Sequence, residues 1–90
     1  MRRVVGTSMY PKLRPGQVLF ATPVFRRIVP GQVVIFDHAG RQKVKRVEEV
    51  KNNQVFVIGD NLNASTDSRH FGWLPEDRIV ARVFWPKLAK

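Results

Sequence analysis

Cysteine is absent from this 90-residue sequence. Its absence excludes disulfide bonds, thiolate nucleophiles and cysteine-ligated metal sites. Long hydrophobic runs are absent too: no window reaches the ~18 apolar residues of a membrane-spanning helix, and the N-terminus has no apolar stretch of the length found in a secretory leader. We therefore expect the chain to lie in the cytoplasm or at the periphery of a membrane.

Acidic residues are scarce, since 7 Asp and Glu stand against 16 Lys and Arg, for a net charge of +9. This excess of positive charge attracts anions such as nucleic acid, an acidic membrane or an acidic protein. No run reaches five like charges, so the sequence does not predict a dedicated basic tail. A solvated basic surface is the simplest interpretation, and peripheral contact with an anionic membrane stays open as an alternative.

A helical period is also missing. Six Gly and six Pro punctuate β-branched and aromatic runs of strand length. The runs at 43–50 and 55–58 predict a hairpin, and one helical turn is expected at 75–77. We predict a single domain over residues 1–90, all-β, compact and mainly antiparallel, with a coiled or barrel-like sheet and little or no helix. The expected strands are 3–5, 18–21, 33–36, 43–50, 55–58 and 79–85.

Ser8 lies in a loop that differs from a simple connector. Gly6 allows a sharp turn and Pro11 stiffens the chain just after the serine, which would expose the Ser8 hydroxyl together with a backbone N–H. A serine hydroxyl becomes a good nucleophile when a neighbouring base removes its proton, and a neutral lysine can serve as that base. An ordinary serine-containing turn is the alternative interpretation.

Lys45 is the candidate for such a base. It lies in a predicted strand, in a Lys-Arg pair flanked by valines, where Lys45 and Val47 share one face while Val44 and Arg46 share the other. A lysine that points the same way as a buried valine loses hydration, and this lowers the pKa of its amine. The alternative interpretation is an edge strand with solvated charges.

The two histidines offer another route to serine activation. A serine–histidine–carboxylate triad would use His70 with either Asp60 or Asp67, although nothing in their spacing favours it. His38 is typical of a hairpin tip. The histidines and the loop carboxylates lack metal-ligand spacing, so we predict no metal site and no cofactor.

Three segments carry a more specific signal. Residues 6–13 read Gly-Thr-Ser-Met-Tyr-Pro-Lys-Leu, and residues 44–47 read Val-Lys-Arg-Val. Residues 59–72 contain Gly-Asp-Asn, then Ser, then Asp-Ser-Arg, then Gly. In their order and spacing these segments resemble three sequence boxes of type I signal peptidases, serine proteases that share a serine–lysine dyad with LexA-like self-cleaving proteins.

The resemblance implies a role for each matching residue. Ser8 would attack the scissile carbonyl, and its own N–H would donate to the oxyanion. Unprotonated Lys45 would take the Ser8 proton and later pass it to the leaving amine. Ser65 would hydrogen-bond the Lys45 amine and orient it.

Further residues would support this site. Residues 59–75 are predicted to form a long polar loop. The resemblance implies that Arg46, Asp67 and Arg69 form a charge cluster that holds this loop beside the strand predicted at 43–50. Met9 and Tyr10 are expected to line the substrate cleft, with a core or surface role left equally open.

The function implied is that of a serine endopeptidase that removes an N-terminal leader or signal segment from a protein substrate. The chain is similar to short, anchorless members of the family, including maturation proteases for nickel-type superoxide dismutase. The alternative is a non-catalytic basic β module that binds nucleic acid or a protein partner, for which no RNA-binding motif with interleaved aromatics is present. The aromatic residues Trp73, Phe84 and Trp85 are expected in the core rather than in an exposed patch.

Overall fold

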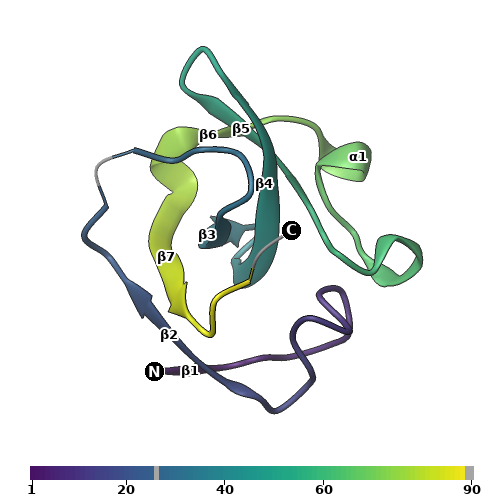
Figure 1. Cartoon of the computed structure of the whole chain (residues 1–90). Helices are drawn as coiled ribbons and strands as arrows, with labels where there is room; N and C mark the ends of the chain where they lie inside the picture. Colours follow the sequence, from purple (N-terminus) through teal and green to yellow (C-terminus); the bar gives the residue numbers. More distant parts are fainter. Residues whose placement is uncertain (26, 89–90) are drawn as a thin grey trace.

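The computed structural model describes residues 1–25 and 27–88. Within that part of the chain, seven antiparallel strands form one curved sheet in the order β1-β2-β7-β3-β4-β5-β6 (Figure 1). The predicted fold class, mainly antiparallel β structure with little helix, is confirmed. The strands are β1 (Arg2–Arg3), β2 (Val18–Thr22), β3 (Val33–His38), β4 (Arg41–Lys51), β5 (Gln54–Ile58), β6 (Leu74–Pro75) and β7 (Ile79–Trp85).

Two tight hairpins connect the strands on which the candidate site is built. Ala39 and Gly40 join β3 to β4 with φ of 53° and 76°, and Asn52 and Asn53 join β4 to β5 with φ of 52° and 62°. Paired residues with positive φ are typical of two-residue turns, because the twist of such a turn matches that of the flanking strands. The hairpin predicted across the two asparagines is therefore confirmed.

Strand β3 lies at the centre of the core. Its run Val33–Phe36 is buried on both faces, as a continuous apolar run predicts. Val33 and Ile35 pack in one apolar cluster, while Val34 and Phe36 face the other side of the strand and pack in a second cluster. The first group also contains Val4, Met9, Leu13, Leu19, Ala81 and Val83, and the second contains Ile28, Val47, Val55, Val57, Leu74 and Ile79.

Short helices interrupt the segment that was predicted as a long polar loop. They are η1 (Leu62–Ala64) and α1 (Ser68–Phe71), and a third short helix, η2 (Glu76–Arg78), follows β6. The helical turn predicted at 75–77 corresponds to η2, whereas α1 is too short to produce a helical period in the sequence. Among the described residues, no helix has the length and apolar content needed to cross a bilayer.

Aromatic side chains form an exposed cluster where β2 meets β7. Phe20, Phe84 and Trp85 are 40%, 50% and 53% exposed, and the Phe20 ring lies 6.4 Å from that of Phe84 and 5.8 Å from that of Trp85. The prediction that Phe84 and Trp85 belong to the core is wrong. Alternation along β7 buries Ile79, Ala81 and Val83, so Phe84 faces outward and Trp85 lies beyond the core at the end of the strand. Trp73 is half-buried.

Candidate active site

Ser8 lies on a turn that its neighbours anchor to the core. The side chains of Met9 and Leu13 are 1% and 0% exposed and pack beneath the turn. Backbone hydrogen bonds close it, from the Tyr10 N–H to the Thr7 carbonyl at 3.0 Å and from the Leu13 N–H to the Met9 carbonyl at 2.9 Å. Ser8 itself stays half-buried, so its side chain is available at the surface of a cavity.

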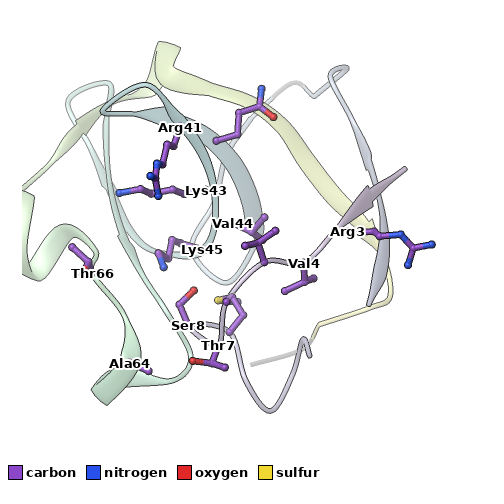
Figure 2. A pocket seen from close by; sticks show the side chains of 14 residues that line it. Arg3, Val4, Thr7, Ser8, Arg41, Lys43, Val44, Lys45, Ala64 and Thr66 are labelled. Atoms are coloured by element: carbon purple, nitrogen blue, oxygen red, sulfur yellow. The ribbon is translucent and has the colours of Figure 1, made fainter. Parts of the chain in front are cut away.

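Lys45 faces Ser8 across this cavity. Both residues line a pocket of about 340 Å³. Figure 2 shows the Lys45 amine and the Ser8 hydroxyl pointing toward one another, the first from β4 and the second from the N-terminal turn. Lys45 is 5% exposed, so the alternative of a solvated lysine on an edge strand does not hold.

The surroundings of Lys45 favour its neutral form. Burial lowers the pKa of the Lys45 amine below that of an ordinary lysine, because the ammonium loses hydration. The Asp67 carboxylate opposes this change, while the positive charges of Lys43 and Arg69 reinforce it. The amine therefore gives up its proton at a lower pH than an exposed lysine does.

Asp67 anchors the segment that runs beside this pair. Its side chain is 0% exposed, and its carboxylate accepts hydrogen bonds from the Gly59 N–H at 2.9 Å and the Ser65 hydroxyl at 2.8 Å. It also accepts from Arg69 through the backbone N–H, Nε and Nη2 at 3.1, 2.9 and 3.0 Å. Burial alone would raise the pKa of Asp67, but the hydrogen bonds, led by those of Arg69, outweigh it and hold the pKa well below its ordinary value.

Ser65 has a different partner from the one implied by the sequence. Its hydroxyl donates to Asp67 Oδ2 at 2.8 Å, whereas a bond to the Lys45 amine was expected. A hydrogen bond to an ionised carboxylate is stronger than one between neutral groups, which explains this preference. The Ser65 oxygen still has lone pairs with which it can accept a hydrogen bond.

Gly59 brings this segment into close contact with Ser8. A Cβ at this position would lie 2.6 Å from the Ser8 carbonyl oxygen and 2.3 Å from Ser65 Oγ, so only glycine fits. Nearby, the Asn61 N–H donates to the Ser8 carbonyl at 2.7 Å, and Asn61 Nδ2 donates to the Thr7 carbonyl at 3.0 Å. The sequence singled out Gly59 only as part of a motif, because no local signal joins residues so far apart in the chain.

Arg46 forms a separate anchor and is 1% exposed. Its Nε and Nη2 donate to Oδ1 and Oδ2 of Asp60, each at 2.9 Å. Its Nη1 donates to the carbonyls of Gly31 at 2.7 Å and Leu88 at 2.6 Å. This one side chain therefore ties together three segments that are distant in the sequence.

The prediction that Arg46 joins Asp67 and Arg69 in one charge cluster is wrong. Arg46 pairs with Asp60, while Asp67 pairs with Arg69 at 2.9 Å. Alternation along β4 explains the difference, because neighbouring residues of a strand point to opposite faces and Arg46 turns away from the face of Lys45. The Arg46–Asp60 pair ties the start of the segment 59–72 to β4, while the Asp67–Arg69 pair lies within that segment.

The remaining candidates lie in different places. His70 is 56% exposed and is absent from the residues that line the pocket, so the alternative triad is not assembled. Its Nδ1 accepts from the Asp67 N–H at 3.3 Å and completes a capping box at the start of α1. His38 ends β3 at a hairpin tip, as predicted. Met9 lines the pocket from the core, whereas Tyr10 is 46% exposed and lies outside the lining.

Comparison with known families adds an independent observation. Residues 37–88, more than half of the chain, match the family model for signal peptidases, peptidase S26. The chain belongs to the peptidase S26 signal peptidase family. The matched residues include Lys45, Arg46 and the segment 59–72, and they begin after Ser8, so the match does not bear on the serine.

Curated relatives of this S26 family member include three signal peptidases. Signal peptidase I of Bacillus caldolyticus is 49% identical over 35 residues, covering 36% of this chain and 19% of the relative. Signal peptidase IB of Staphylococcus aureus is 45% identical over 40 residues, covering 41% and 21%. A probable signal peptidase I-2 of Synechocystis is 39% identical over 41 residues, covering 42% and 19%. The matched region thus spans about a fifth of the length of each relative.

The close contact at Gly59 yields a first prediction. Gly59→Ala should lower the free energy of unfolding by about 1–3 kcal/mol, because the added methyl group overpacks a site bounded by backbone. Urea unfolding followed by circular dichroism measures this change. Asn63→Ala, an exposed substitution in the same segment, serves as the control and should change stability by less than about 0.5 kcal/mol. Equal effects of the two substitutions would contradict the packing argument.

The Asp67 carboxylate yields a second prediction, for acid stability. Because the folded pKa of Asp67 lies below its unfolded value, its stabilising contribution is complete near neutral pH and is lost as the pH falls through the acidic range. Asp67→Asn should lower stability by about 1–3 kcal/mol at pH 7 and flatten the loss of stability toward pH 3. Urea unfolding at both pH values tests this, with the exposed Asp77→Asn as control. An unaltered pH dependence in Asp67→Asn would refute it.

Proposed function

We propose that this S26 family member is a serine endopeptidase in which Ser8 is the nucleophile and Lys45 is the general base. The observation that carries the proposal is the shared pocket, in which a buried amine with a lowered pKa points at a serine hydroxyl. Membership of a serine peptidase family supports the same reaction class. A neutral lysine can activate serine without a histidine or a metal.

The proposed reaction proceeds through an acyl-enzyme. Lys45 Nζ accepts the Ser8 proton while Ser8 Oγ attacks the scissile carbonyl carbon, and the resulting ammonium passes the proton to the leaving amine. Water then attacks the ester, with Lys45 acting again as base. The Ser8 N–H is the proposed donor to the oxyanion, and Thr7, which also lines the pocket, is a candidate for a second donor.

Four other residues have positioning roles in this proposal. Asp67 holds Ser65 and Arg69 next to Lys45, and the bond from the Ser65 hydroxyl to Asp67 leaves the Ser65 oxygen free to accept from the lysine. Arg46 fixes the strand that carries the base through its pair with Asp60. These contacts keep the amine buried, which favours its neutral form.

The proposed substrate is a protein from which an N-terminal leader or signal segment is removed. Such a segment can bind in extended form along the pocket, where main-chain hydrogen bonds provide affinity. As a finer proposal, the substrate is the precursor of a nickel-type superoxide dismutase. The short hairpin between Lys45 and Gly59 supports this subgroup, because it leaves no inserted domain beside the pocket.

The dyad predicts that either of two single substitutions removes most or all of the cleavage activity. Ser8→Ala should remove measurable turnover, and Lys45→Ala should lower kcat by about 10²–10⁴-fold, because the general base is lost. The assay follows a nickel-type superoxide dismutase precursor and a secretory preprotein by mass spectrometry, with circular dichroism to verify the fold. Lys51→Ala, on the same strand but outside the pocket, is the matched control. Cleavage by Ser8→Ala at the wild-type rate would disprove the dyad. Salt-sensitive binding of a nucleic-acid duplex without proteolysis would favour the non-catalytic alternative.

The pH profile gives a separate prediction. The neutral amine of Lys45 is the active form, so kcat/KM should rise with pH, with a midpoint below that of an exposed lysine because burial lowers the pKa. Lys43→Gln removes a like charge that lowers the pKa of Lys45, so the rising limb should move to higher pH. Lys51→Gln should leave it in place. A rate that does not vary from acid to alkaline pH, or a shift in the opposite direction, would contradict Lys45 as the base.

A further inference from the structure

The wall of the pocket beyond Lys45 is positively charged. Arg41, Lys43 and Lys45 alternate along β4, so their side chains share one face of the strand. All three line the pocket that contains Ser8, and Figure 2 shows their side chains on the same side of β4. Arg3, the remaining cation of the lining, points away from them and donates to the Gly16 carbonyl at 3.0 Å.

Negative charge does not balance this wall. None of the described residues that line the pocket carries a carboxylate. The acidic group that acts on the pKa of Lys45 is Asp67, which is fully buried and already bonded to Arg69. The positive charges of Arg41 and Lys43 are therefore available to a group that enters the pocket from solvent.

Lys43 is held in place by contacts with two uncharged rings, those of His38 and Phe71. Its Nζ lies 3.1 Å from Nδ1 of His38 and 5.5 Å from the centre of the Phe71 ring. Burial, together with the neighbouring cations Lys43 and Arg78, lowers the pKa of His38, so the imidazole is neutral near pH 7 and accepts from the lysine. An ammonium has three donors, and two remain for a ligand.

The strand edge beside these cations is open. Strand β5 pairs with β4 only from Arg46 onward, so in the described part of the chain no strand covers that edge of residues 41–45. The pocket lies between this edge and the segment 3–9, which carries Ser8. An extended peptide can add to the open edge as a strand, and its side chains then alternate in step with those of β4.

We propose that Lys43 and Arg41 select substrates that carry an acidic side chain on one side of the scissile bond, and this inference rests on the proposed function. With the scissile carbonyl beside Lys45 and Ser8, a substrate residue about two positions away faces Lys43, because alternate residues of a strand are ~7 Å apart. A residue about four positions away faces Arg41. Aspartate or glutamate at these positions forms an ion pair with the wall, whereas lysine is repelled.

A peptide series tests this selection. Peptides identical except for Asp, Ala or Lys are compared by kcat/KM, with the substitution placed in turn at each position from five before to three after the cleaved bond. Asp should be preferred over Ala by about two- to fivefold at one or two alternate positions on one side, the size expected of exposed ion pairs. Raising the salt concentration to 1 M should reduce the preference. Equal rates for Asp, Ala and Lys at every position would overturn the inference.

Charge reversal identifies the residues responsible. Lys43→Glu and Arg41→Glu should each invert the preference at one position, so that the Lys peptide becomes better than the Asp peptide. The ratio of the two rates is compared within each variant, so a general loss of activity does not affect it. Lys51→Glu changes the net charge by the same amount on the same strand outside the pocket, and it should keep the wild-type ratio. The same inversion in Lys51→Glu would assign the effect to overall charge and overturn the inference.

Binding to an inactive variant separates this inference from the proposed function. Fluorescence anisotropy of labelled Asp and Ala peptides with Ser8→Ala requires no catalysis. Tighter binding of the Asp peptide than of the Ala peptide supports the charged wall, provided that adding Lys43→Glu abolishes the difference. If the wild-type protein cleaves no peptide but this difference is found, only the proposed dyad fails. If all peptides are cleaved and all bind with equal affinity, the dyad is retained and the proposed selection for acidic side chains is rejected.

Discussion

The buried carboxylate of Asp67 is the interaction on which the rest of the site depends. It accepts hydrogen bonds from Gly59, Ser65 and Arg69, and so closes the segment 59–72 upon itself. Closure places Gly59 against the Ser8 carbonyl, at a distance that tolerates no side chain. One ionised group thus determines the position of a turn more than fifty residues earlier in the chain, and the cost of burying its charge is offset by the hydrogen bonds that it accepts.

Lys45 and Arg46 show two ways of burying a cation on one strand. Arg46 is held by four hydrogen bonds to Asp60, Gly31 and Leu88, a geometry that suits the planar guanidinium. Lys45 is buried on the opposite face, and its pKa falls instead. The alternation of a β-strand separates a structural charge from an amine suited to proton transfer, although the two residues are adjacent in sequence.

Much of the fold was predictable because its signals are local. Short β-branched runs bounded by Gly, Pro and Asn predicted every strand except the two-residue β6, although β1 lies at Arg2–Arg3 and not at 3–5, and Asn52-Asn53 predicted the hairpin. The partners of Arg46 and Ser65 were not predictable, since the choice between Asp60 and Asp67 depends on how the segment 59–72 folds. Exposure of Phe84 was missed for a similar reason, because the register of β7 and not hydrophobicity decides which face a residue occupies.

The open edge of β4 has a consequence for the behaviour of the protein at high concentration. Unpaired N–H and C=O groups on a strand edge offer a template to which a second molecule can add, and this is a common origin of aggregation. Residues 41–45 carry three basic side chains along such an edge. Two molecules that approach edge to edge bring these charges together, so mutual repulsion disfavours self-association while leaving the edge accessible to a chain of opposite charge.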